Sequence, residues 1–158
     1  MSKVIFLDVD GVLNDSFTED RAPGGYIGLN DSMIENLAKI IKETDAKVVL
    51  VSTWKVEWDK DPTKRSQDGE YLDKKLKEHG IEIFDKTKDR VSNRGQGIIE
   101  WLNNHTDVEN FVVLDDDVFA DYYTYNIMPH LAQTRFYRGG LIEEIADQAI
   151  CMLNMDFK

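Results

Sequence analysis

The sequence predicts an α/β fold, with a mostly parallel sheet covered by helices on both faces. Short runs of β-branched and aromatic residues alternate along the chain with segments whose apolar residues repeat at helical spacing. The strand-like runs are apolar at successive positions, which is typical of strands buried on both faces. They also end abruptly in polar residues. Because right-handed crossovers align parallel strands, these polar ends are expected to meet at one edge of the sheet.

The first half of the chain predicts two strands and one helix. Residues 3–7 form a strand that ends at Asp8, and residues 47–51 form a second strand that ends in Ser52, Thr53 and Trp54. Between them, the polar and glycine-rich segment at about 12–30 predicts an irregular flap loop. A helix follows to about residue 44, and Ser32 with Glu35 has the spacing of a capping box.

The second half predicts a small charged loop at about 55–68 and then further alternation of helices and strands. Leu72 and Leu76 indicate a helix that Gly80 closes, and apolar residues at 98–102 indicate another. The expected strands are 81–84, 110–114 and 133–137, and the expected last helix is 140–153. The strand at 110–114 ends in three consecutive acids, Asp115 to Asp117.

Length and composition limit the possible classes of protein. A chain of 158 residues fits a single domain over 1–158. With 30 acidic against 19 basic residues, the net charge of -11 opposes long-range attraction to nucleic acid or anionic membranes. A local basic patch could still form from Lys55, Lys60, Lys64 and Arg65. No apolar run approaches the roughly 18 residues of a membrane span. We expect no membrane partner and a cytoplasmic location. The single cysteine, Cys151, is expected to be a small buried apolar residue.

Two groups of acids are expected to converge at the edge of the sheet. Asp8 and Asp10 follow the first strand at alternate positions, Gly11 permits a tight turn, and Asp115 and Asp116 follow another strand. Carboxylates held this close either take up protons or bind a hard cation, and such oxygen ligands suit Mg²⁺. Magnesium is therefore the expected cofactor.

The same residues could transfer a phosphoryl group. A carboxylate nucleophile such as Asp8 divides one difficult displacement into two easier steps, and Asp10 could act as the general acid and base. Ser52 offers a hydroxyl group, and Arg94 could supply a cation near the start of a helix. Arg90, Lys88 and Lys86 are the alternative cations.

The run Asp8-Val9-Asp10-Gly11-Val12-Leu13 resembles motif one of the haloacid dehalogenase (HAD) superfamily, and nearly the whole chain follows the order of its motifs. This resemblance implies a three-layer Rossmann-like fold and Mg²⁺-dependent phosphatase activity. It implies that Asp8 is the nucleophile, that Asp10 is the acid/base, and that Ser52 and Arg94 are the second and third motifs. Asp116, in the pair with Asp115, would bind the metal together with Asp8 and the backbone carbonyl of Asp10. We expect Gly11, Thr53 and Trp54 to contact the substrate.

The spacing of the motifs leaves no room for a large inserted cap domain, so the site should be open or minimally covered. Open sites of this kind resemble those that serve bulky substrates, and Ser52-Thr53-Trp54 resembles the HAD domains associated with RNA repair proteins. The expected substrate is a phosphorylated small molecule, such as a nucleotide, or a nucleic-acid end, and no obligate protein partner is evident.

Two other classes of protein share some of these features. A response-regulator receiver domain has similar groups, but it would carry its phospho-accepting Asp after the middle strand, where this chain has Ser52. A catalytically silent phosphate-binding or interaction module with the same fold stays open as the alternative to an enzyme.

Overall fold

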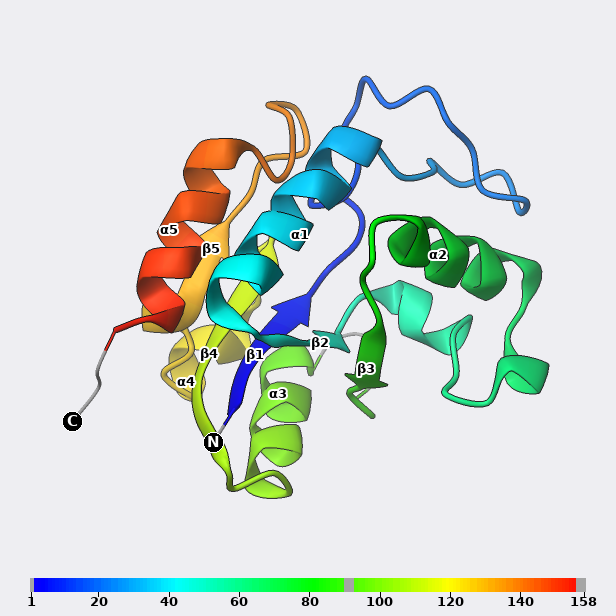
Figure 1. Ribbon diagram of the computed structural model, residues 1–158. Helices are drawn as coiled ribbons and strands as arrows, with labels where there is room; N and C mark the ends of the chain where they lie inside the picture. Colours follow the sequence, from blue (N-terminus) through cyan, green and yellow to red (C-terminus); the bar gives the residue numbers. More distant parts are fainter. Residues whose placement is uncertain (1, 90–92, 156–158) are drawn as a thin grey trace.

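Five parallel strands form one sheet with the order β3-β2-β1-β4-β5, as seen in a computed structural model that describes residues 2–89 and 93–155 (Figure 1). The strands are β1 (Ser2–Leu7), β2 (Lys47–Leu50), β3 (Ile83–Lys86), β4 (Val108–Asp115) and β5 (Leu131–Gln133). The α-helices are α1 (Asp31–Thr44), α2 (Gln67–Glu78), α3 (Arg94–Asn103), α4 (Ala120–Thr124) and α5 (Glu143–Leu153). Short 3₁₀ helices occur at Thr53–Val56, Pro62–Lys64 and Met128–His130. The predicted α/β class is confirmed.

Helices cover both faces of the sheet, and the central strand β1 has side chains buried on each. Ile5 and Leu7 belong to the apolar cluster that includes residues of α1 and α5, while Val4 and Phe6 belong to a second cluster with residues of α3 and α4. All four side chains are 0% exposed. Alternate residues of a strand point to opposite faces, so burial on both faces accounts for the continuous apolar run.

Two predicted helix starts are wrong. The N-cap of α1 is Asn30, whose side-chain oxygen accepts from the Ser32 backbone N–H at 3.0 Å. The predicted capping box would have made Ser32 the cap. The last helix begins at Glu143 rather than at residue 140, because Gly139 and Gly140 have φ values of +89° and +55°, in the left-handed region.

Two other expectations in the C-terminal third are also wrong. The last strand occupies 131–133 rather than 133–137, since the chain turns after Thr134 and Arg135 bridges back to Gly140. Cys151 is exposed on α5 rather than buried, because the apolar face of that helix is formed by Ala146, Ala149 and Leu153.

The two predicted loops are each anchored to α2. In the flap loop, Gly24 donates its backbone N–H to Asp68 at 2.8 Å, and Leu29 donates to the Tyr71 hydroxyl at 2.9 Å. In the charged loop, Trp58 is 2% exposed and its indole N–H donates to Asp73 at 3.1 Å. Helix α2 therefore fixes both segments beside the carboxyl end of β2.

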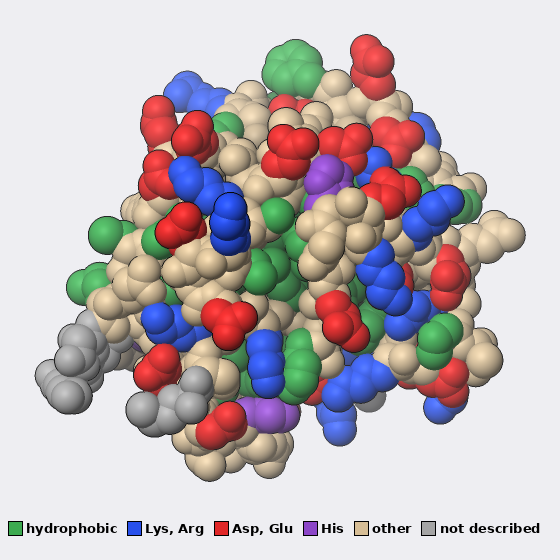
Figure 2. All heavy atoms as spheres, in the orientation of Figure 1, with side chains coloured by type: hydrophobic (Ala, Val, Ile, Leu, Met, Phe, Trp, Pro, Cys, Tyr) green, Lys and Arg blue, Asp and Glu red, His purple; other side chains and the backbone are tan. Residues whose placement is uncertain are grey.

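Among the described residues, no helix is long and apolar enough to cross a membrane. Acidic and basic side chains are intermingled on the face shown in Figure 2.

Candidate active site

Three buried or half-buried carboxylates meet at the carboxyl edge of the sheet. Asp8 directly follows β1, Asp115 ends β4, and Asp116 comes next along the chain. One oxygen from each lies within 4.8 Å of the others. The convergence arises because Asp8 N–H donates to the Leu114 carbonyl at 2.9 Å and so continues the pairing of β1 with β4. Asp10, in contrast, directs its carboxylate to a different set of partners.

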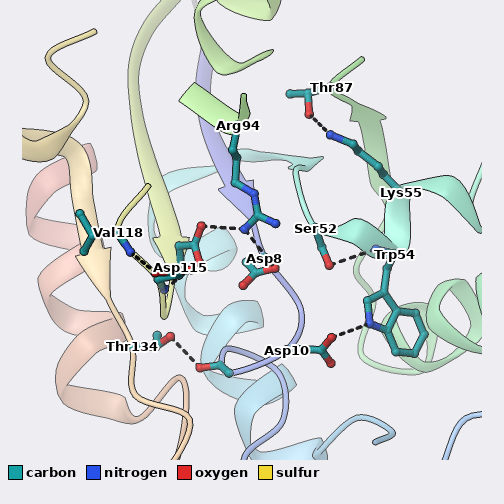
Figure 3. A network of polar contacts seen from close by, with 12 residues as sticks. Asp8, Asp10, Ser52, Trp54, Lys55, Thr87, Arg94, Asp115, Val118 and Thr134 are labelled. Carbon is teal, nitrogen blue, oxygen red and sulfur yellow. Dashed lines mark hydrogen bonds and ion pairs between the residues drawn. The ribbon is translucent and has the colours of Figure 1, made fainter. Parts of the chain in front are cut away.

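Arg94 is the sequence-predicted cation that reaches these acids. Its guanidinium Nη1 lies 2.8 Å from Asp115 Oδ2 and 3.5 Å from Asp8 Oδ1 (Figure 3). Arg94 is 5% exposed and begins α3, so the start of that helix places it in the site. The guanidinium thereby offsets part of the repulsion between the two acids.

Asp115 has two further donors. The Tyr122 hydroxyl donates to Asp115 Oδ2 at 2.7 Å, and the backbone N–H of Asp117 donates to Asp115 Oδ1 at 3.0 Å. Tyr122 was not among the site residues predicted from the sequence. The structure buries it completely, on α4, where it holds Asp115 in place.

The acids carry more negative charge than the nearby donors neutralise. Burial and the neighbouring Asp115 raise the pKa of Asp8 well above its ordinary value, although Arg94 opposes this shift. Burial and Asp115 also raise the pKa of Asp116. Such a set of hard oxygen donors fits a divalent cation such as Mg²⁺. Asp8, Asp115 and Asp116 are the residues that could hold it.

The turn after β1 brings Gly11 against Asp116. Gly11 has a φ of +82°, and a Cβ atom at this position would lie 2.2 Å from Asp116 Oδ2, so no other residue fits without movement. Asn14 stabilises the turn: its Oδ1 accepts from the Gly11 N–H at 2.9 Å, and its Nδ2 donates to Asp10 Oδ1 at 2.9 Å. Sequence reasoning missed Asn14, although an Asn three residues after a turn glycine is a recognisable local signal.

Asp10 is exposed and is held by donors on both of its oxygens. Asn14 donates to Oδ1. The indole N–H of Trp54 donates to Oδ2 at 3.2 Å (Figure 3). Trp54 is itself 5% exposed, so a nearly immobile ring fixes the direction of an accessible carboxylate. This gives Trp54 a contact with Asp10 as well as its predicted contact with substrate.

Ser52 and Thr53 lie at the end of β2 with different surroundings. Ser52 is 1% exposed, and its Oγ accepts from the Trp54 backbone N–H at 3.2 Å as the N-cap of a 3₁₀ helix. That bond uses a lone pair of the oxygen and leaves its proton available for donation. Thr53 is exposed and lines a small pocket together with Asp10 and Trp54.

The other candidate cations lie elsewhere. Lys86 donates to the backbone carbonyls of Lys55 and Trp58, at 2.8 and 2.5 Å, and Lys88 is exposed. Arg90 lies outside the described residues. The structure therefore favours Arg94 among the candidates that it describes.

The four residues of the possible basic patch have different environments: two are buried in ion pairs and two are exposed. Lys55 is buried in an ion pair with Asp89 at 2.8 Å, and the side chain of Arg65 is buried against Asp73 at 3.1 Å. Lys60 and Lys64 are exposed.

A parallel sheet with an Asp-x-Asp turn after its central strand, an acid pair after the neighbouring strand and a buried cation between them define a domain of the HAD superfamily. The model of one family, described as the HAD domain in Swiss Army Knife RNA repair proteins, matches residues 4–144. The chain belongs to this family. Comparison with curated proteins and comparison with solved structures gave no match.

Proposed function

We propose that this protein is a Mg²⁺-dependent phosphomonoester hydrolase that acts through an aspartyl-phosphate on Asp8. The observation that carries the proposal is the difference in burial and in hydrogen-bond partners between Asp8 and Asp10. Asp8 lies buried beside Arg94 and two other carboxylates, whereas Asp10 is exposed and held by separate donors. One acid is thus placed to act as a nucleophile and the other to exchange protons with substrate and water.

In the first step, a carboxylate oxygen of Asp8 forms a bond to phosphorus while the bond from phosphorus to the leaving oxygen breaks. Asp10, in its protonated form, gives its proton to that leaving oxygen. Arg94 holds Asp8 in place, and the Ser52 hydroxyl is available to donate to a phosphoryl oxygen.

In the second step, Asp10 takes a proton from water as that water attacks phosphorus. The bond between phosphorus and Asp8 breaks, which releases inorganic phosphate and restores both carboxyl groups to their starting states. Asn14 and Trp54 keep Asp10 in one orientation through both proton transfers.

The metal site follows from the same acids. Asp8, Asp115 and Asp116 would hold Mg²⁺, with the backbone carbonyl of Asp10 as a further ligand suggested by the resemblance to the superfamily. When bound, Mg²⁺ supplies positive charge that stabilises the negative charge on the phosphoryl oxygens.

The substrate is proposed from the context of the family and from the open site. The family is described by its occurrence in RNA repair proteins, which supports a nucleotide or the phosphorylated end of a polynucleotide as substrate. The net charge of -11 requires that such an anion be recognised by local contacts rather than by long-range attraction.

The proposal is tested by hydrolysis of an aryl phosphate with and without Mg²⁺. Wild type should release phosphate only with Mg²⁺, and Asp8→Asn should lose this release. Asp117→Asn is the matched control because Asp117 is exposed and lies outside the three-acid cluster. Nucleotides and 3′- or 5′-phosphorylated oligonucleotides then identify the substrate. Absence of release from every compound would refute the enzyme and favour a silent phosphate-binding module.

A further inference from the structure

A small pocket opens beside Asp10, on the side where Trp54 lies. Its volume is about 170 Å³. At about 30 Å³ for each water molecule, this space holds five or six waters, which corresponds to one ring rather than a chain of several groups. Four segments form its walls: the turn after β1, the flap loop, the 3₁₀ helix after β2 and the start of α2. The lining residues are Asp10, Tyr26, Thr53, Trp54, Val56, Glu57 and Asp68.

Two of the apolar side chains in the wall, those of Tyr26 and Val56, are largely exposed. Tyr26 is 61% exposed and Val56 is 75% exposed. The ring of Tyr26 lies 6.2 Å from that of Trp54, which is itself buried and bonded to Asp10. An aromatic and an aliphatic side chain at the rim of a ring-sized pocket suit contact with a flat ligand.

The polar part of the wall consists of three carboxylates and the hydroxyl group of Thr53. Asp10, Glu57 and Asp68 line the pocket, and the lining residues include no Lys or Arg. Asp68 also has a structural role, because its Oδ1 accepts from Gly24 and anchors the flap loop. When ionised, Glu57 and Asp68 can only accept hydrogen bonds, so this wall favours a ligand that donates or carries positive charge and repels a second phosphate.

We propose that this pocket holds the leaving group of the substrate and selects an uncharged or cationic ring that donates hydrogen bonds. The inference rests on the proposed function, because Asp10 can protonate the leaving oxygen only if the leaving group lies on its side. The substrate class is therefore a phosphomonoester whose leaving group places one donor-bearing ring in the pocket, such as a nucleoside with no second phosphate there.

Leaving groups that differ only in charge test this selection. We compare kcat/KM for phenyl phosphate substituted at the para position with aminomethyl or with carboxylate. Wild type should prefer the aminomethyl compound by at least about tenfold, which is about 1.4 kcal/mol. Glu57→Gln should reduce that preference at least about threefold. Dividing the kcat/KM ratio of each variant by that of wild type cancels the difference in intrinsic reactivity between the two esters.

Glu109→Gln is the matched control, because Glu109 is exposed near the start of β4, at the opposite end of the sheet from the site. It should keep the preference of wild type. Equal hydrolysis of both esters by wild type, or an unchanged preference in Glu57→Gln, would overturn the proposal.

A binding measurement separates this proposal from the proposed function. The indole N–H signal of Trp54, assigned with Trp54→Phe, is followed by NMR during titration with 4-(aminomethyl)phenol or 4-hydroxybenzoate. The amine should shift this signal saturably and the carboxylate should not. The signal of Trp101, which donates to Asp85, should stay unchanged. If no phosphate ester is hydrolysed, the proposed function fails, but the titration still tests the proposed selectivity of the pocket. Absence of a shift with the amine would refute that selectivity.

Discussion

Asp8→Asn should stabilise the metal-free protein while it abolishes turnover. Asp8 has one oxygen within 4.8 Å of oxygens from both Asp115 and Asp116, and Arg94 lies 3.5 Å from it. At effective dielectric constants of 80 to 20, each repulsion is worth about 1 to 3.5 kcal/mol and the attraction to Arg94 about 1 to 5 kcal/mol. The net repulsion is about 0.5 to 2 kcal/mol. Its removal should raise Tm by about 1 to 8 °C.

Thermal unfolding in EDTA and in Mg²⁺ measures this effect. A ligand at 100 times its Kd adds about 2.7 kcal/mol to the stability of the folded state. Wild type should gain this increment from Mg²⁺, and Asp8→Asn should gain much less because it has lost one carboxylate ligand. The order of the two Tm values should therefore reverse: the variant should be more stable than wild type in EDTA and less stable in Mg²⁺.

The control for these melting curves is Glu109→Gln, at the opposite end of β4, which should follow wild type in both conditions. The reasoning would be refuted by an Asp8→Asn variant that is less stable than wild type in EDTA. An equal gain from Mg²⁺ in both proteins would remove Asp8 from the metal site.

The same carboxylate predicts a dependence on pH. Because the folded-state pKa of Asp8 is raised above its ordinary value of 3.8, the folded protein takes up the proton before the unfolded chain does. In EDTA, the contribution of this group to stability should rise as pH falls from above the folded pKa towards 3.8. The advantage of Asp8→Asn should shrink over that window. An advantage that grows as pH falls would contradict the assigned direction.

Three further substitutions test contacts around the site. Trp54→Phe keeps a ring but removes the donor to Asp10, so kcat/KM should fall about 10- to 100-fold in a steady-state assay. Gly11→Ala must adopt a positive φ and displace Asp116, so calorimetry should show about 1 to 3 kcal/mol lost, with a weaker response to Mg²⁺. Tyr122→Phe leaves Asp115 with one donor fewer, and denaturant unfolding should show about 1 to 3 kcal/mol lost. An unchanged value in one of these assays would show that the corresponding contact does not contribute to activity or stability.

The sequence was sufficient for the α/β class and for the position of the acids, because both depend on local patterns. A run that is apolar at every position indicates a strand buried on both faces, and the residue where it stops marks the edge of the sheet. This logic placed Asp8, Ser52 and Asp115 at strand ends, where the structure also has them. Parallel topology then brought Asp8 and Asp115 together.

Local patterns could not identify the partners of each side chain. Arg94 was one of four candidate cations, and its choice depends on how the start of α3 packs against β4. The hydroxyl of Tyr122 meets Asp115 only because the short helix α4 folds back over the strand end. At α1 the cap is Asn30 rather than the predicted Ser32, and the Asn30 side chain accepts from the Ser32 N–H.

The arrangement of charge links stability to the proposed chemistry. Asp115 is completely buried and receives Arg94, Tyr122 and a backbone N–H, so its charge is largely compensated within the fold. Burial and the neighbouring Asp115 raise the pKa values of Asp8 and Asp116, and the donors around these two acids do not offset that shift. If stability alone had shaped this edge of the sheet, amides or apolar residues would serve better at both positions. Uncompensated carboxylates beside a buried arginine are instead what a site needs when a cation and a phosphoryl group complete its charge.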